Sequence, residues 1–293
     1  MSNRALTPGH RLGPFDIEGV LGAGSFGITY RAHDRNLHRS VAIKEFFPRA
    51  YAARDPDRVT VNPQSEGHAR GYRGGLNLFL NEARVLAKYR HPSIVRVSQL
   101  FRANNTAYIV MDYEKGATLS AVLKRTTHFT TRRIVELARE LLSGLSKLHE
   151  AGVIHCDIAP RNIILRDDGS YVLIDFGAVR TLWDAEVTAG SGNRYTPAYA
   201  PPELWFTGAP TGPWSDIFCL GAVLYHCITG EAPLDASRRK RLVDNATRGL
   251  DSVHLALAVQ KESRPAGLLD TVRWMLALTP ERRPQSAGEI LAA

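Results

Sequence analysis

Three side chains that end in a carboxylate or an amide cluster around one predicted hairpin. Asp157 and Asn162 precede the apolar run 163–165, and Asp175 follows the apolar run 171–174. Such oxygens are the ligands that Mg²⁺ prefers beside substrate phosphates, so Asn162 and Asp175 are candidate magnesium ligands. A carboxylate can also take a proton from an attacking hydroxyl, and Asp157 is the candidate for that role.

A glycine-rich segment near the start of the chain has the pattern GxGxxG. The residues after it, Ile28, Thr29 and Tyr30, are β-branched or aromatic, which predicts a following strand rather than a helix. Between two strands, glycines let backbone N–H groups approach a phosphate without interference from Cβ. A plain hairpin turn is the alternative for this motif taken alone. The segment consists of Gly22, Ala23, Gly24, Ser25, Phe26 and Gly27.

A lysine and a glutamate form a second candidate pair. Lys44 ends the apolar run Val41–Lys44, and a cation at the end of an apolar strand needs anionic partners. A phosphate and a carboxylate would supply them. Glu82 is the acid inside the predicted helix 76–89 and is the candidate carboxylate; a solvated acid on the helix face is the alternative.

The elements that must position these residues change character along the chain. Strands are predicted at 15–21, 28–32, 41–44, 95–97 and 107–111. The first part of the chain holds one predicted helix, 76–89, and a long predicted loop, 48–75, which is rich in Pro, Gly, Arg and Asp. Helical patterns dominate the rest, including the amphipathic run 134–148 and the apolar helix 216–228.

This order predicts an α+β fold of two lobes: a small β-rich N-lobe with one helix and a large, mainly helical C-lobe. Residues 1–14 are taken as an N-terminal extension. The N-lobe is placed at about 15–111, the hinge at about 112–118 and the C-lobe at about 119–293.

The composition is that of an ordinary soluble globular protein. The chain has 293 residues, of which 44% are hydrophobic and 23% charged, values that argue against disorder, collagen and coiled coils. Three cysteines make neither a disulfide framework nor a zinc site. The N-terminus lacks the apolar core of a signal peptide, and no apolar run is long enough to span a bilayer, so we expect a cytoplasmic protein without a membrane contact.

The net charge of +8 raises the question of nucleic-acid binding, because Lys and Arg number 37 and Asp and Glu 29. No nucleic-acid-binding motif accompanies this charge, and we expect no nucleic-acid partner. The excess of positive charge falls in two local patches: the arginines of the segment 48–75 and the run 238–241. Solvated surface is one interpretation of these patches, and contact with an acidic protein partner is the other.

In this order the motifs resemble those of the eukaryotic-type (Hanks-type) protein kinase family, and of bacterial Ser/Thr protein kinases in particular. The resemblance extends over about residues 15 to 290. Its motifs are GxGxFG at 22–27, VAIK at 41–44, HxDxxxxN at 155–162, DFG at 175–177 and PPE at 201–203. It implies a bilobal kinase fold with ATP in the cleft between the lobes and Mg²⁺ as the metal cofactor.

The resemblance assigns a role to each candidate residue. Residues 22–27 would cover the ATP phosphates, and Lys44 would hold the α- and β-phosphates and pair with Glu82. Asp157 would be the catalytic base, and Asn162 and Asp175 would hold magnesium. The adenine would contact residues of both lobes and the hinge: Leu21, Thr29, Ala42, Met111 as gatekeeper, Asp112, Tyr113, Glu114 and Ile164.

Three further contacts are implied within the large lobe. Glu203 would pair with Arg283, and Asp216 would bind the backbone of the catalytic loop. Thr196, in the segment 195–203 that resembles the GTPxYxAPE of Ser/Thr kinases, would contact Asp157.

The sequence departs from the family pattern beside the base. Cys156 replaces the arginine that pairs with a phosphate on the activation loop, so we expect activity to depend little on phosphorylation at Thr181, Thr188 or Ser191. Ala159 replaces the lysine of Ser/Thr kinases, whereas Arg161 stands where tyrosine kinases have arginine and could supply a cation near the γ-phosphate. The segment 195–203 favours Ser/Thr specificity.

The function expected is transfer of the ATP γ-phosphate to Ser/Thr hydroxyls of proteins. A nucleotide-binding scaffold without catalysis is one alternative, suggested by Cys156 and Ala159. A small-molecule kinase of similar fold is another, and the peptide-docking features around Thr196 and Glu203 argue against it.

Overall fold

A computed structural model of the chain describes residues 4–126, 129–176, 180–181, 195–205, 209–245, 251–260 and 264–292. The chain divides into two compact units. Unit 1 consists of residues 1–90 and 95–114, and unit 2 of residues 91–94 and 115–293.

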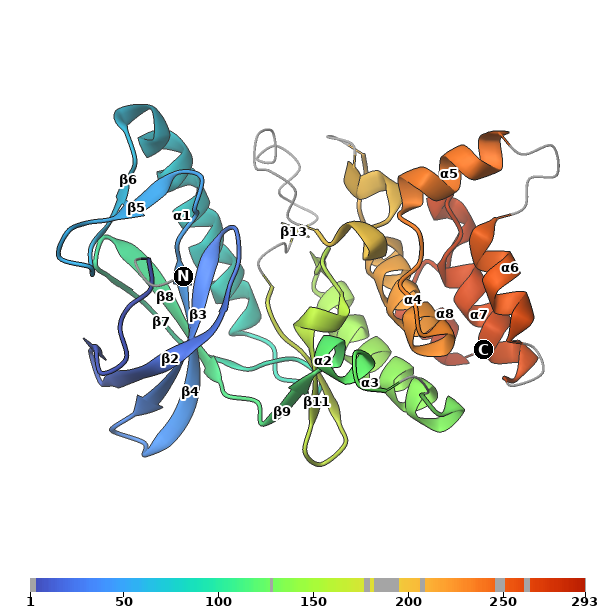
Figure 1. The fold of residues 1–293 in the computed structure, drawn as a ribbon, viewed down its shortest axis with the longest axis horizontal. Helices are drawn as coiled ribbons and strands as arrows, with labels where there is room; N and C mark the ends of the chain where they lie inside the picture. The colour runs from blue at the N-terminus through green and yellow to red at the C-terminus, as the bar shows by residue number, and fades with distance from the viewer. Residues whose placement is uncertain are drawn as a thin grey trace. The chain divides into compact units, whose positions relative to one another are not determined.

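Unit 1 is built on a six-stranded antiparallel sheet with the order β1-β2-β3-β4-β8-β7 (Figure 1). A long helix, α1 (Glu66–Leu86), packs on this sheet. The strands are β1 (Arg11–Leu12), β2 (Phe15–Ala23), β3 (Gly27–Asp34), β4 (Arg39–Phe46), β7 (Val97–Ala103) and β8 (Thr106–Asp112). The strand-rich first part of the chain with one long helix is therefore confirmed.

Period-two burial in β3 explains why this segment is a strand. In β3, Ile28, Tyr30 and Ala32 are buried, whereas Thr29 and Arg31 between them are more exposed. Alternate residues of a strand point to opposite faces, so Ile28, Tyr30 and Ala32 share one buried face of the sheet.

The segment predicted as a loop, 48–75, is largely regular structure, and this prediction was wrong. It contains a short hairpin of β5 (Ala52–Arg54) and β6 (Val61–Pro63), and α1 begins at Glu66 instead of residue 76. The helix also ends at Leu86, before the predicted residue 89.

The glycines in the first half of α1 explain this error. Glycine disfavours a helix by about 1 kcal/mol relative to alanine, so local propensity predicts a loop. In the fold, Tyr72 packs its ring 5.4 Å from that of Phe46. A Cβ on Gly75 would lie 3.0 Å from Cζ of Phe46, so the helix approaches the strand closely because that position has no side chain. Tertiary packing therefore overrides the low local propensity.

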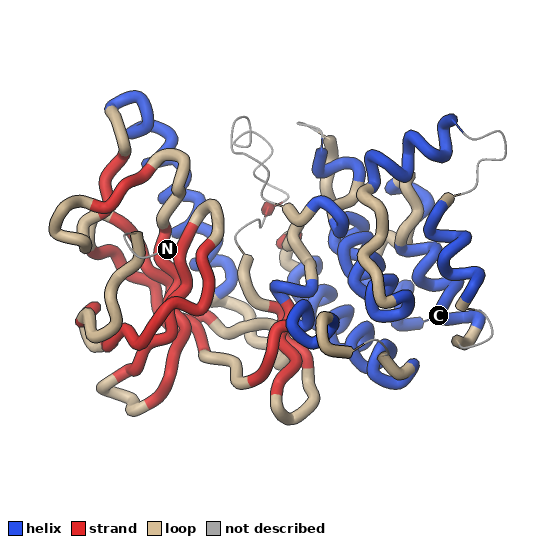
Figure 2. The backbone as a smooth tube through the Cα atoms, in the orientation of Figure 1, coloured by secondary structure: helices blue, strands red, loops and turns tan. Residues whose placement is uncertain are grey.

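Unit 2 is mainly helical (Figure 2). Its helices are α2 (Leu119–Leu123), α3 (Thr131–Glu150), α4 (Pro213–Thr229), α5 (Ala236–Asn245), α6 (Ser252–Val259), α7 (Ala266–Met275) and α8 (Ala287–Ala292). It also holds a three-stranded sheet, β12-β11-β9, made of β9 (Gly116–Thr118), β11 (Ile163–Arg166) and β12 (Tyr171–Leu173). A strand pair joins β10 (Val153–Ile154) to β13 (Arg180–Thr181). The predicted α+β class, a β-rich part followed by a helical part, is confirmed.

Two helices of unit 2 show why the sequence forms them. The first, α3, begins after Thr130, whose side chain accepts from the Arg133 N–H, and it buries one apolar stripe. The second, α4, is buried on nearly all sides and ends at Thr229, followed by Gly230 in the left-handed conformation. Because α4 is apolar all round, it forms the centre of unit 2. No helix within the described part of the chain combines the length and apolarity needed to cross a membrane.

Candidate active site

The backbone that carries Asp157 is held by a buried carboxylate at the start of α4. The backbone N–H groups of His155 and Cys156 each donate to Asp216, at 2.8 Å, and Asp216 is fully buried. Cys156 has φ 64°, a left-handed conformation that is uncommon for a residue other than glycine. The predicted contact of Asp216 with the catalytic loop is confirmed.

Two histidines complete the support of this loop. His149, at the end of α3, lies with Nε2 2.9 Å from Oδ2 of Asp216, a contact that the sequence analysis missed. His155 accepts the Asp157 N–H at Nδ1, and its ring lies 4.6 Å from that of Phe176. Burial lowers the pKa of His155, so this ring is neutral and can accept.

Four hydrogen bonds orient the carboxylate of Asp157. Its Oδ1 accepts from the N–H and hydroxyl of Thr196, at 2.9 and 2.8 Å. Its Oδ2 accepts from Arg161 at 2.7 Å and from the amide of Asn162 at 2.9 Å. The predicted contact between Thr196 and Asp157 is confirmed, and Arg161 bonds the same carboxylate.

The two candidate metal ligands lie on adjoining segments. The Asn162 carbonyl accepts the N–H of Ile174 at 2.8 Å, which ties the end of β12 to the catalytic loop immediately before Asp175. Asp175 has φ 61°, another left-handed backbone. The Asn162 Nδ2 donates to Asp157, so Oδ1 is the amide atom with metal-binding chemistry. An amide oxygen and a carboxylate on neighbouring segments fit a hard cation such as magnesium.

A buried ion pair braces the segment that follows Thr196. Arg283 donates to both oxygens of Glu203, at 2.7 and 3.1 Å, and its side chain is fully buried. Further bonds join Arg283 to carbonyls of Ala277 and Leu278, and its guanidinium lies 4.8 Å from the Phe218 ring centroid. The predicted pair is confirmed.

Cys156 packs in an apolar cluster beside the base. The cluster joins it to Ile154, Ala200 and Leu204. All three cysteines are buried and reduced, and burial raises the pKa of Cys227 to about 12. Burial in an apolar cluster favours a packing role for Cys156. Thr188 and Ser191, and the side chain of Thr181, lie outside the described residues.

The glycine-rich segment forms the predicted turn between two strands. Gly22 pairs with Thr29 and Ala23 with Ile28, and the Gly24 N–H donates to the Gly27 carbonyl at 2.9 Å. Ser25 and Phe26 complete the turn, and Leu21 before it is half exposed. A Cβ at position 27 would lie 2.5 Å from the Glu45 carbonyl oxygen, so glycine is required there.

Lys44 and Glu82 lie on β4 and α1, which pack together. Nζ of Lys44 is 5.9 Å from the ring centroid of Phe79, one helical turn before Glu82. The rings of Phe46 and Phe79, 5.4 Å apart, make a second contact between the strand and the helix. Lys44 is 8% exposed, so its ammonium group lies in a largely desolvated place.

The predicted gatekeeper, Met111, lies in β8, and the hinge residues begin at Asp112, the last residue of this strand. Ala42 pairs with Met111, which is buried, and the Asp112 N–H donates to the Arg96 carbonyl at 3.0 Å. The Asp112 side chain pairs with Arg39 at 3.0 Å. Tyr113 lies under the guanidinium of Arg31, at 5.0 Å, while Glu114 ends unit 1. In unit 2, Ile164 is buried in β11.

Replacing Gly116 by alanine is expected to destabilise unit 2 by about 1–3 kcal/mol. Gly116 has φ 147°, and an added Cβ would lie 2.1 Å from the carbonyl oxygen of Leu165 on the neighbouring strand. Urea denaturation followed by tryptophan fluorescence measures this loss. Gly267→Ala is the matched control because Gly267 lies in α7 of the same unit, with nothing within 4 Å of the added Cβ. Equal stability of the two variants would contradict the prediction.

Two arginines of the basic patches are buried, so neither solvated surface nor contact with an acidic partner describes them. Arg239 pairs with Asp251, and Arg54 pairs with Glu45; each arginine side chain is 1% exposed. Nothing in the sequence separates them from their exposed neighbours, because their partners are set by packing. The other arginines of the two segments for which exposure is described, Arg49, Arg58, Arg70, Arg73, Arg238 and Arg241, are exposed or nearly so.

Known proteins resemble the chain along its whole length. The family model described as "Protein kinase domain" matches residues 15–293. The serine/threonine-protein kinase PknB of Mycobacterium tuberculosis is 30% identical over 292 residues, which are 98% of this chain and 43% of that protein. The serine/threonine-protein kinase PknD of the same species is 28% identical over 293 residues, 100% of this chain and 41% of that protein.

The chain thus spans less than half the length of these curated relatives. Among solved structures, "PpkA-294 apo form" aligns with a TM-score of 0.82 and 31% identity, covering 99% of both chains.

Proposed function

The chain belongs to the protein kinase family, and from this premise we propose that it transfers the γ-phosphate of ATP to Ser/Thr hydroxyls of proteins, with magnesium. The arrangement around Asp157 carries the proposal. A carboxylate held by four donors, two of them from Thr196, is a positioned base for an acceptor hydroxyl.

Phosphoryl transfer asks a protein mainly for positioning and for neutralisation of charge. Asp157 would accept the proton of the acceptor hydroxyl and orient its oxygen. Asn162 and Asp175 would hold Mg²⁺, which when bound neutralises charge on the phosphates. Arg161, which is bonded to Asp157, adds a positive charge beside the reacting group.

The residues of unit 1 would act on the nucleotide. Backbone N–H groups of residues 22–27 would cover the phosphates, since glycine leaves the backbone accessible there. Lys44 would bind the α- and β-phosphates, with Glu82 orienting its ammonium group. The adenine would be read by the hinge, 112–114, and contacted by Leu21, Thr29, Ala42 and Met111. Ile164 of unit 2 is the further residue that the family resemblance assigns to the adenine.

The proposal includes Ser/Thr specificity and little dependence on activation-loop phosphate. Thr196 contacts Asp157 through both its N–H and its hydroxyl, as expected from the Ser/Thr-type segment. Cys156 contacts apolar residues at the position where a phosphate-binding arginine is otherwise found. A thiol cannot pair with a phosphate as a guanidinium does, so we expect phosphorylation to have little effect through position 156.

Replacing Lys44 by methionine is expected to lower phosphate transfer from ATP to a generic acceptor protein by about 10²- to 10³-fold, because a preorganised cation on the phosphates is removed. Transfer of labelled phosphate in the presence of Mg²⁺ measures the loss. Lys88→Met is the matched control, since Lys88 is exposed at the end of α1 and should retain full activity.

Different outcomes separate the alternatives. Thermal stabilisation by ATP with no transfer from the wild-type chain would indicate a non-catalytic scaffold. Transfer to small hydroxyl compounds but not to protein would indicate a small-molecule kinase. Equal transfer by the wild type and by Lys44→Met would refute the role assigned to Lys44.

A further inference from the structure

A carboxylate lies fully buried beside Lys44 and has no part in the proposed chemistry. Glu45 follows Lys44 in β4 and is 0% exposed. Because an isolated buried charge is costly, such a group needs partners. Successive residues of a strand point to opposite faces, so Glu45 lies behind the sheet relative to Lys44.

The partners of Glu45 come from three different elements. Tyr30 of β3 donates to Oε2 at 2.7 Å, and Tyr108 of β8 donates to Oε1 at 2.8 Å. Arg54 of the β5–β6 hairpin lies 2.6 Å from Oε2. Burial and the charge of Glu45 raise the pKa of both tyrosines, so their hydroxyls remain protonated and act as donors. One carboxylate therefore ties β4 to both neighbouring strands and to the hairpin.

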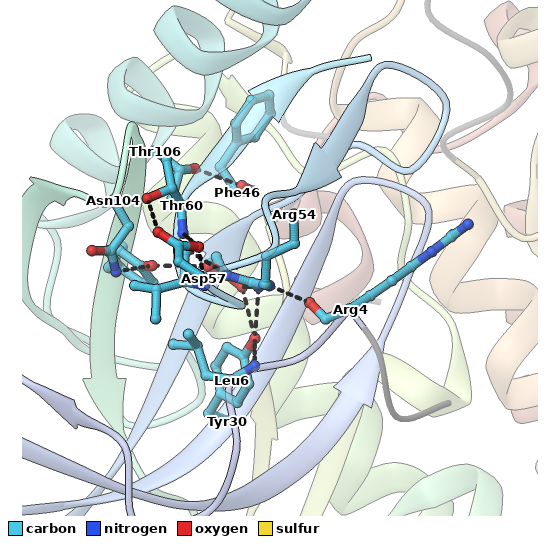
Figure 3. Close-up of polar contacts among 12 residues, drawn as sticks. Arg4, Leu6, Tyr30, Phe46, Arg54, Asp57, Thr60, Asn104 and Thr106 are labelled. Atoms are coloured by element: carbon cyan, nitrogen blue, oxygen red, sulfur yellow. Dashed lines mark hydrogen bonds and ion pairs between the residues drawn. The ribbon is translucent and has the colours of Figure 1, made fainter.

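Arg54 extends these bonds to the start of the chain. It donates to the Arg4 carbonyl and to the Val59 carbonyl, both at 2.7 Å, and its guanidinium lies 5.2 Å from the Phe47 ring centroid. The N–H of Leu6, a buried residue, donates to the Tyr30 hydroxyl at 3.1 Å. Figure 3 shows Arg54 bonded on one side to Arg4 and on the other to Tyr30. Residues 4–6 are thus integrated into unit 1.

The β5–β6 hairpin, which carries Arg54, is held by hydrogen bonds within its own turn and to a neighbouring turn. Asp57 accepts from the backbone of Val59 and Thr60 and from the Thr60 hydroxyl, which closes the turn (Figure 3). The Val61 N–H donates to the Asn104 carbonyl at 3.0 Å, and the Asn105 amide donates to the Val61 carbonyl at the same distance. These hydrogen bonds therefore anchor the hairpin to the β7–β8 turn, and moving it away from the sheet would break them.

The end of β4 is held as well. The hydroxyl of Thr106, at the start of β8, donates to the Phe46 carbonyl at 2.6 Å (Figure 3). Glu45 and Phe46, the two residues that follow Lys44, are thus both bonded from behind the sheet. On the front face, Lys44 reaches toward Phe79 of α1. Because β4 is held by these bonds, the direction in which the Lys44 side chain points is fixed.

We propose that Glu45 and Arg54 are positioning residues for Lys44: their buried pair, closed over by residues 4–6 and the hairpin, holds β4 so that Lys44 is directed at the nucleotide phosphates. This inference rests on the proposed function. Lys44 contacts the nucleotide, and Glu45 and Arg54 act only through it. A pair with a merely structural role would lower stability without a specific effect on ATP.

The test is a double-mutant cycle on the dissociation constant of a fluorescent ATP analogue with Mg²⁺. One arm is Lys44→Met, and the other is Glu45→Gln with Arg54→Met, which removes both charges and leaves none buried alone. We expect each arm to weaken binding about tenfold, and the combination to weaken it about tenfold instead of a hundredfold, because both changes remove the same interaction. The KM for the acceptor protein should stay within about twofold in the Glu45/Arg54 variant.

The matched control removes the buried pair of unit 2, by Arg239→Met with Asp251→Asn. It should lower the melting temperature and leave the affinity for the analogue unchanged. If Lys44→Met weakens binding but the folded Glu45/Arg54 variant binds like the wild type, or if the two effects multiply, the inference is overturned and the proposed function stands. If Lys44→Met itself binds the analogue like the wild type, the binding role assigned to Lys44 fails and this inference fails with it. The proposed function, which is carried by Asp157, is then decided separately by the phosphate-transfer assay.

A milder variant covers the case in which the Glu45/Arg54 variant does not fold. Tyr30→Phe removes one hydroxyl, the group that joins Leu6 and Glu45, and keeps the buried ring. We expect it to weaken binding of the analogue about threefold. Unchanged affinity in this variant would also overturn the inference.

Discussion

Replacing Asp157 by asparagine is expected to lower the rate of phosphate transfer by about 10³-fold. The variant loses the carboxylate that would take the proton. The substitution also disturbs the hydrogen bonds that hold this side chain in place. Each oxygen of Asp157 now accepts two hydrogen bonds, from Thr196 on one side and from Arg161 and Asn162 on the other. An asparagine has one oxygen, so its NH₂ group would face donors on one of the two sides.

The measurement is kcat with saturating ATP and acceptor, together with the affinity for ATP, which should stay close to that of the wild type. Glu140→Gln is the matched control, because it makes the same carboxylate-to-amide change at a residue that accepts the Tyr171 N–H away from the site. It should keep kcat within about twofold. Retention of more than about a tenth of the wild-type kcat by Asp157→Asn would show that another group is the base.

Replacing Arg283 by methionine is expected to lower the free energy of unfolding of unit 2 by about 3–5 kcal/mol, because it leaves the carboxylate of Glu203 buried without its cation. The guanidinium also bonds backbone carbonyls near α7 and lies over Phe218 at the centre of unit 2, so packing is lost as well. The four tryptophans of the chain, Trp183, Trp205, Trp214 and Trp274, all belong to unit 2. Urea denaturation followed by tryptophan fluorescence therefore reports this unit.

Arg132→Met is the control for Arg283. Arg132 makes an exposed pair with Glu136 one turn along α3, and solvent screens such pairs, so its loss should leave the denaturation midpoint unchanged. The denaturation midpoint of Arg283→Lys should lie between those of Arg283→Met and Arg132→Met. Lysine keeps the positive charge, but it cannot bond both oxygens of the carboxylate as the guanidinium does. A midpoint of Arg283→Met equal to that of Arg132→Met would contradict the bracing role of the pair.

Much of the local structure could be predicted because it depends on near neighbours in the chain. The strand around Ile28 follows from residue types that favour strands, the strand around Ile43 from a short apolar run, and the helix around Leu141 from a period-3.6 pattern. The glycine turn followed from the residue types on either side of it. The start of α1 could not be predicted, since Gly75 disfavours a helix locally and is accommodated by the ring of Phe46.

The chemistry of the candidate site also followed from residue types and motif order. Asp157, Asn162 and Asp175 were identified from their side-chain oxygens and their spacing, and the contacts of Thr196, Asp216 and the Glu203–Arg283 pair came from the family resemblance. The hydrogen bonds of Asp157 with Arg161 and Asn162, and the contact of His149 with Asp216, are seen only in the tertiary structure.

The pattern of residue types was enough to establish the α+β order of elements and the kinase motifs, because both depend on residues that are close together in the sequence. Packing alone decided which charges are buried. Arg54 and Arg239 look like their exposed neighbours in sequence, yet each is paired inside the protein with a carboxylate from another segment. The physical reason is that the cost of burying a charge is met by partners brought together only when the chain folds, and no local pattern records where they meet.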